Sequence, residues 1–166
     1  MSVLVRAPYY APRSDIDRFV TSKSSWIAKH RRRMSENMSK AKSLGVLSHE
    51  DISHLADEAL TDIPQRVRKY APIIGVTYGR ITIRNQRTRW GSCSAKGNLN
   101  FNCLLMLCSE EIRDYVVVHE LCHRIELNHS PRFWALVESV LPDYRLSVKW
   151  LRENGPAIME RMTGGG

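Results

Sequence analysis

The chain has 166 residues, a formal net charge of +8, and 43% hydrophobic and 25% charged residues, which is typical of one ordinary globular domain. No stretch of about 18 consecutive apolar residues occurs, which argues against a membrane-spanning helix. The N-terminus also lacks an apolar run of signal-peptide length. We therefore expect a cytoplasmic protein with a single domain over residues 1–166, in which 80–152 form the functional core and 164–166 a flexible tail.

The positive charge is concentrated at the N-terminal end. Residues 1–48 contain ten lysines and arginines against three acidic residues, a net charge of +7. An excess of this size favours polyanions or acidic substrates as partners. A solvated, charged helix face explains the same composition at least as well, and no phosphate contact follows from charge alone.

The first elements in the chain are mainly helical. Residues 3–7 have the pattern of a short strand ended by a proline. Apolar residues at helical spacing predict a helix from about residue 15 into the thirties. Ser48 and Asp51 form a capping-box-like start to a second helix, in which Pro64 predicts a kink or a break.

The pattern then changes to that of a small sheet. Residues 80–84 and 99–104 alternate polar and apolar side chains, and a turn signal at 96–98 separates the later strand from what precedes it. We interpret 80–105 as a small antiparallel sheet containing a hairpin.

Three more helices are predicted after the sheet. Ser109 is a candidate N-cap, because the two acidic residues that follow it suit the positive end of a helix dipole. The helix that begins here should end near Asn128. Pro131 suits the first turn of the next helix. A last helix is expected from Tyr144 to about Glu153. The whole pattern predicts an α+β fold with a helical N-terminal half.

The string His119-Glu120-Leu121-Cys122-His123 is the most informative part of the sequence. On a helix, this spacing places both imidazoles on one face about one turn apart. Two such rings can bind one cation, and zinc favours nitrogen ligands in tetrahedral geometry. Glu120 follows the first ligand directly, which suits a base acting on a zinc-activated water better than a ligand.

A catalytic zinc site needs a third protein ligand and an open position. His129 follows His123 by six residues, beyond the expected helix end, where a turn can bring the chain back toward the metal. Glu126 is the main rival, as an acidic residue near the helix end. The other three histidines are distant in sequence. We therefore predict one Zn²⁺ per chain, bound by His119, His123 and His129.

The residues that contact substrate are less well defined by the sequence. Arginines before the hairpin and aromatic and basic residues at the start of the last helix are the candidates, and a surface charge or a packed aromatic ring is the competing interpretation for each. The candidates are Arg87, Arg89, Trp90, Tyr144 and Arg145.

None of the four cysteines forms a CxxC pair, so they do not indicate a zinc ribbon. In a reducing compartment we expect buried thiols rather than disulfides.

Three segments together resemble a known family: 89–94 (RWGSCS), 114–123 (DYVVVHELCH) and 128–134 (NHSPRFW). The chain resembles the YgjP-like metallopeptidase family over most of residues 80–152, with a looser likeness over 3–27. It is similar, more distantly, to the WLM and SprT-like zinc proteases. The resemblance implies a zincin-type α+β fold, His119, His123 and His129 as zinc ligands, and Glu120 as the catalytic carboxylate.

Three functions remain open at this point. The first is a metallopeptidase that holds an extended peptide or protein substrate against an edge strand. The second is a metal-dependent nucleoside triphosphate pyrophosphatase of the UTP type, since nucleotide hydrolysis has been ascribed to a family member. The third is a nucleic-acid-associated, SprT-like protease, although no nucleic-acid-binding motif is readable. The motif favours the peptidase.

Overall fold

The computed structural model describes residues 4–162, with side chains 33, 37, 38 and 40–42 left undescribed. Helices predominate over one small sheet, which confirms the predicted α+β class. The elements are α1 (Arg13–Ser22), α2 (Ser24–Leu44), α3 (His49–Ile74), β1 (Ile81–Arg84), β2 (Gly91–Cys93), β3 (Leu99–Asn102), the 3₁₀ helix η1 (Cys103–Leu107), α4 (Glu110–Cys122), α5 (Pro131–Val140) and α6 (Tyr144–Glu160).

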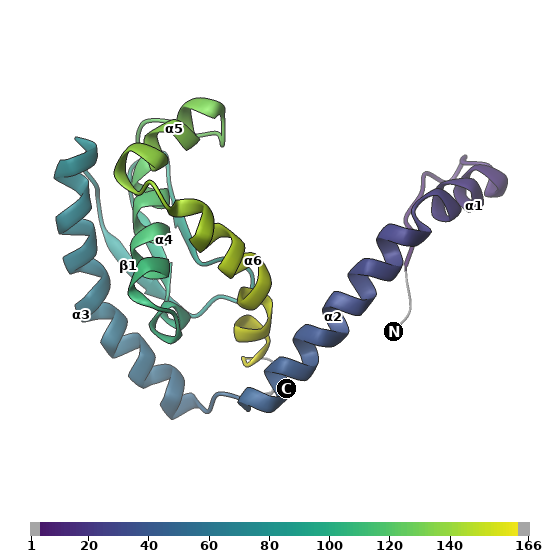
Figure 1. Cartoon of the computed structure of the whole chain (residues 1–166), viewed down its shortest axis with the longest axis horizontal. Helices are drawn as coiled ribbons and strands as arrows, with labels where there is room; N and C mark the ends of the chain where they lie inside the picture. The colour runs from purple at the N-terminus through teal and green to yellow at the C-terminus, as the bar shows by residue number, and fades with distance from the viewer. Residues whose placement is uncertain (1–3, 163–166) are drawn as a thin grey trace.

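Helices α1 and α2 form an arm that extends away from the rest of the chain (Figure 1). The single helix predicted here is interrupted at Lys23. Hydroxyl groups just before the break compete with helix bonds, because Thr21 Oγ1 donates to the carbonyl of Asp17 and Ser22 Oγ to that of Phe19. The predicted strand was wrong for residues 4–7, which form no ladder with any described strand; its first residue, 3, lies outside the described part.

The long helix α3 begins as the sequence predicts. Ser48 Oγ accepts a hydrogen bond from the Asp51 backbone N–H, and the Asp51 carboxylate accepts one from the Ser48 backbone, completing the capping box. Of the two alternatives predicted at Pro64, a kink or a break, the break was wrong, because the helix continues to Ile74. Ile63 and Val67 on either side of the proline are fully buried, and this packing outweighs the missing backbone bond.

The sheet is mixed, not antiparallel as predicted. Its strand order is β1-β3-β2, with β1 parallel to β3 and β2 antiparallel to it. The hairpin between β2 and β3 is confirmed, and Gly97 in its turn has a φ of 81°. The buried Asn102 fixes the connection from β1 to β2, since its amide donates to the carbonyls of Gln86 and Arg89. This connection crosses β3 and makes β1 run parallel to it.

Helix α4 lies between α3 and α6 (Figure 1), and most of its side chains are buried in the core. It ends at Cys122 rather than near Asn128 as predicted. His123 is its C-cap residue, and a turn follows in which the backbone N–H groups of Arg124 and Ile125 donate to the carbonyls of Leu121 and Cys122. This earlier end lets the chain turn back sharply after the second histidine of the motif.

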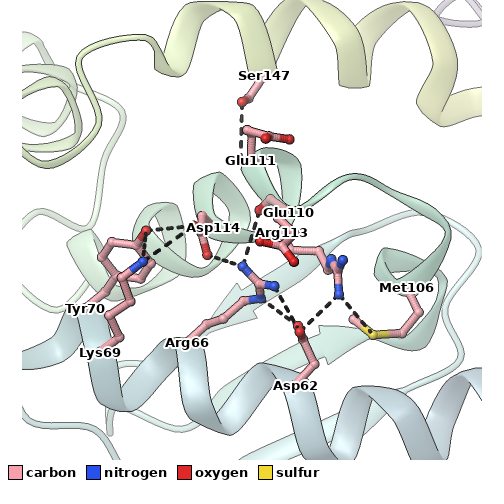
Figure 2. Close-up of polar contacts among 10 residues, drawn as sticks. All are labelled: Asp62, Arg66, Lys69, Tyr70, Met106, Glu110, Glu111, Arg113, Asp114 and Ser147. Atoms are coloured by element: carbon pink, nitrogen blue, oxygen red, sulfur yellow. Dashed lines mark hydrogen bonds and ion pairs between the residues drawn. The ribbon is translucent and has the colours of Figure 1, made fainter.

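A network of charged side chains connects α3 to α4 (Figure 2). The Asp62 carboxylate accepts hydrogen bonds from Arg66 at 2.6 Å and from Arg113 at 3.0 Å. Asp114 on α4 accepts from Arg66 and, at 2.8 Å, from the Tyr70 hydroxyl. These groups are largely shielded from water, so they fix the position of α4 against α3 together with the apolar core.

The last helix, α6, is longer than predicted and reaches Glu160, with Pro156 inside it. It also anchors the base of the arm, because Arg161 Nε donates to the carbonyl of Gly45 at 3.0 Å. The four cysteines carry free thiols, three of them buried, as expected. The tail at 164–166 lies outside the described residues. Within the described part of the chain, no helix is both long and apolar enough to cross a membrane.

Candidate metal centre

Three histidines gather at the end of α4. The imidazole nitrogens of His119, His123 and His129 that can serve as ligands all lie within 4.8 Å of one another. His119 Nε2 and His129 Nε2 are 3.0 Å apart. The first two come from the predicted helix face, and the third comes from the loop before α5. The structure therefore brings together the three residues that the sequence predicts as ligands.

Hydrogen bonds on the outer ring nitrogens orient two of these imidazoles. His123 Nδ1 lies 3.0 Å from the carbonyl oxygen of Glu126, which can only accept, so Nδ1 donates this hydrogen bond and Nε2 is the nitrogen left to bind a cation. Tyr115 Oη lies 3.3 Å from His119 Nδ1. Burial, with the neighbouring His123 and His129, lowers the pKa of His119 to about 3. His119 is therefore neutral at physiological pH, as a metal ligand must be.

Two aromatic rings of α5 pack against the imidazoles. Phe133, which is fully buried, stacks on His123 with ring centroids 4.6 Å apart. Trp134 stacks on His129 at 5.7 Å. Ser130 Oγ caps this helix by accepting from the Phe133 N–H. The cap sets the direction of α5 directly after His129, and so couples the position of the third imidazole to the core.

Glu120 lies against strand β2. Its side chain is buried at 6% exposure, and Gly91 of β2 approaches it closely. Burial raises the pKa of Glu120 to about 8, and the positive charge of Arg89 opposes this rise. The charge of a cation bound at the neighbouring imidazoles would lower this pKa again and so favour the ionised carboxylate. The carboxylate is thus held in a dry position beside the three imidazoles.

A cleft of about 290 Å³ opens over these groups. One wall is the HExxH end of α4 with the loop that follows it, and the other wall is β2. The residues lining it are Arg89, Gly91, Ser92, Cys93, His119, Glu120, His123, Leu127 and His129.

The structure separates the five residues that the sequence suggested for substrate contact. Arg89 lines the cleft, whereas Arg87 is exposed and is not among the lining residues. Trp90 is half-buried and packs against α6, where a Cβ on Gly155 would lie 3.2 Å from its Nε1. Tyr144 is buried and Arg145 exposed, and both line a separate small pocket on α6.

Glu126, the rival ligand, does not belong to the cluster. Its carboxylate lies 4.0 Å from Arg132, and only its backbone carbonyl takes part in the site. Sequence reasoning missed the roles of Tyr115 and Gly91. Tyr115 lies one helical turn before His119, and this spacing could have predicted the contact between the two side chains. The role of Gly91 depends on how β2 packs against α4, which the sequence does not reveal.

The cluster fits a zinc ion. Zinc binds imidazole nitrogen at about 2.0–2.1 Å, so two ligands of a tetrahedral ion lie about 3.3 Å apart. The 3.0 Å between His119 Nε2 and His129 Nε2 is close to that spacing. The donor set is three imidazole nitrogens, and a cleft opens beside them, as catalytic rather than structural zinc sites require.

A helix that carries HExxH, followed by a third histidine and an open cleft, defines the class of metal-dependent hydrolases. Residues 52–154, more than half of the chain, match the YgjP-like metallopeptidase domain. The chain therefore belongs to this family and is an enzyme of the metallopeptidase type, as its sequence motifs predict.

Two solved structures are similar to this chain. The metallopeptidase zymogen abylysin of Pyrococcus abyssi is 25% identical, with 55% of this chain and 97% of that chain covered at a TM-score of 0.47. The metallopeptidase zymogen jannalysin of Methanocaldococcus jannaschii is 21% identical, with 53% and 94% covered at a TM-score of 0.46. A comparison with curated proteins gave no significant match. None of these comparisons supports the nucleotide or nucleic-acid partners considered above.

Proposed function

We propose that the protein is a zinc-dependent peptidase in which His119, His123 and His129 bind one Zn²⁺ and Glu120 is the general base. The observation that carries this proposal is the convergence of three imidazoles and one buried carboxylate on the same cleft. Three imidazole nitrogens turned toward one another match the ligands that zinc favours, and the carboxylate stands outside the ligand set.

The roles of the residues follow from their positions. When bound, zinc lowers the pKa of a coordinated water to about 7 and polarises a carbonyl oxygen. Glu120 accepts a proton from the attacking water as the water oxygen bonds to the scissile carbonyl carbon. The same carboxyl group then gives this proton to the departing amine nitrogen as the C–N bond breaks. Arg89, at the mouth of the cleft, is positioned to contact the substrate.

Strand β2 supports a peptide rather than a small substrate. It lies at the edge of the sheet, paired only with β3, and Gly91, Ser92 and Cys93 line the cleft directly. An extended peptide can pair with such an edge through its backbone, which places its carbonyl groups over the cleft. Recognition through the backbone requires no particular side chain at most positions.

The proposal is tested with an unstructured protein substrate. The zinc-loaded chain is expected to cleave it, chelator is expected to stop cleavage, and added zinc to restore it. Glu120→Gln should lower the rate by about 10²–10⁴-fold while retaining the metal. Nucleoside triphosphates are assayed in parallel. Turnover of nucleotide without any peptide cleavage would reject the peptidase in favour of the pyrophosphatase.

A further inference from the structure

A second pocket lies beside the imidazole cluster, next to the indole of Trp134 that stacks on His129. It has a volume of about 230 Å³ and is lined by Trp134, Tyr144, Arg145 and Val148. The pocket is smaller than the roughly 300–1,000 Å³ typical of sites for drug-sized ligands. Its size therefore suits one large side chain rather than a whole small molecule.

Ring contacts connect this pocket to the metal ligands. Trp134 stacks on His129 with centroids 5.7 Å apart, and on Tyr144 at 5.4 Å with an interplanar angle of 14°. Tyr144 in turn stacks on Tyr115, which contacts His119 Nδ1. A side chain that enters the pocket would thus lie next to the residues that hold and orient the metal.

The lining has a definite chemistry. Two aromatic rings and one aliphatic side chain form its walls, and the guanidinium of Arg145 lies 5.4 Å from the centroid of the Tyr144 ring. Arg145 is exposed and is held at the rim by Glu138 at 3.3 Å. Aromatic rings pair favourably with other rings in stacked or edge-to-face arrangements, and a guanidinium adds a cation–π contact.

We propose that this pocket is a specificity site that receives one aromatic side chain of the peptide substrate. The inference rests on the proposed peptidase function and adds to it a preference that the metal centre alone does not supply. Trp134 links the two sites, because the same indole supports His129 and forms a wall of the pocket.

The test measures binding rather than catalysis. The hydroxamates of phenylalanine and of alanine share the same metal-chelating group and differ only in the side chain. The zinc-loaded protein is expected to bind the phenylalanine compound about tenfold to a hundredfold more tightly, as burial of one large apolar group predicts. Val148→Trp fills the pocket and should remove this difference while leaving the affinity for the alanine compound within about threefold.

Two further variants keep the test decisive. Leu146→Trp introduces the same indole on α6 at a position that is 68% exposed and outside this pocket, so the preference should persist. Arg145→Gln removes the guanidinium from the exposed rim, leaves the three apolar walls in place, and should reduce the preference by about two- to fivefold. It gives an answer even where Val148→Trp fails to fold.

The results separate this inference from the proposed function. Equal affinity for the two hydroxamates in the unmodified protein, or a full preference in Val148→Trp, would overturn the aromatic pocket while leaving peptide cleavage unaffected. A phenylalanine preference that Val148→Trp removes would support the pocket even in a protein that cleaves no peptide, and the absence of cleavage would then count against the peptidase alone.

Discussion

Gly91 of β2 lies directly against the carboxylate of Glu120 on α4. A Cβ atom placed on residue 91 would be 2.8 Å from Glu120 Oε1 and 2.8 Å from its Cγ. Only glycine therefore lets the strand approach the helix without displacing the proposed base. Gly91→Ala is expected to lower peptide cleavage by about a hundredfold, because a shift of about 1 Å at a catalytic group has effects of that size.

The measurement is kcat/KM on a peptide substrate, with the zinc content determined on the same samples. The three atoms nearest to a Cβ at residue 91 all belong to Glu120 and none to a proposed ligand, so the variant should still bind zinc. Ser92→Ala is the control on the same strand and should stay within a few-fold of the unmodified protein. A displaced base should slow the reaction, so normal activity in Gly91→Ala would contradict the role of Glu120 as the base.

Tyr115 lies on the outer nitrogen of His119, with Oη and Nδ1 3.3 Å apart. Partners of this kind fix the orientation of a ligating imidazole, and their loss commonly weakens metal binding by about 10–100-fold. Tyr115→Phe keeps the ring and its stacking on Tyr144 but removes the hydroxyl. We expect zinc affinity to fall by about tenfold, measured by competition with a chelator of known affinity, while Tyr144→Phe leaves it unchanged.

Arg66 connects the two helices of Figure 2 by pairing with both Asp62 and Asp114. Its side chain is 13% exposed, so its removal leaves two carboxylates in a poorly hydrated position. Arg66→Met is expected to lower the free energy of unfolding by about 2–4 kcal/mol, somewhat less than for a fully buried pair. Urea denaturation measures the change.

The control for this substitution is Arg32→Met on the arm. Arg32 also pairs with an acidic residue at helical spacing, Glu36 at 3.0 Å, but its side chain is 84% exposed. Exposed pairs of this kind contribute about 0–1 kcal/mol. Equal losses in the free energy of unfolding would mean that the network between α3 and α4 stabilises the fold no more than an exposed ion pair does.

The same network predicts how stability depends on pH. Burial alone would raise the pKa of Asp62, but hydrogen bonds and charges from Arg66 and Arg113 outweigh it and hold this pKa below its ordinary value. The stabilisation is therefore complete above the unfolded-state pKa of about 3.9 and is lost as the pH falls through the lower folded-state value.

Asp62→Asn should consequently be less stable than the unmodified protein at pH 7, with the difference shrinking below about pH 4. Asp57 is exposed on the same helix, so the difference in stability between Asp57→Asn and the unmodified protein should not shrink as the pH falls. Urea denaturation at a series of pH values measures both. A difference that stays constant from pH 7 to pH 3 would contradict the ion-pair explanation.

The gathering of three histidines could be predicted from the sequence because its signals are local. Helical spacing places His119 and His123 on one face, and a turn after the helix can return only the next histidine, His129, to them. The helix end was harder to predict. Charged and apolar residues continue past Cys122 without a glycine or proline, yet the helix stops there and His123 becomes its cap.

The features that the sequence missed depend on contacts between distant segments. The parallel pairing of β1 with β3 follows from the connection that Asn102 holds, and alternation within a strand carries no information about its partner's direction. The unbroken helix at Pro64 similarly results from tertiary packing. The aromatic pocket on α6 combines residues from two helices. The sequence indicated only two of its residues, Tyr144 and Arg145, as candidates for substrate contact.

Zinc binding by the unmodified chain and by His129→Ala tests the central claim most directly. The unmodified protein is expected to bind one Zn²⁺ per chain in a calorimetric titration, and loss of the third imidazole should weaken binding by at least about a hundredfold. His49→Ala, an exposed histidine of α3 outside the cluster, should bind as the unmodified protein does. An unmodified chain that takes up no zinc, or a His129→Ala variant with full affinity, would contradict the account.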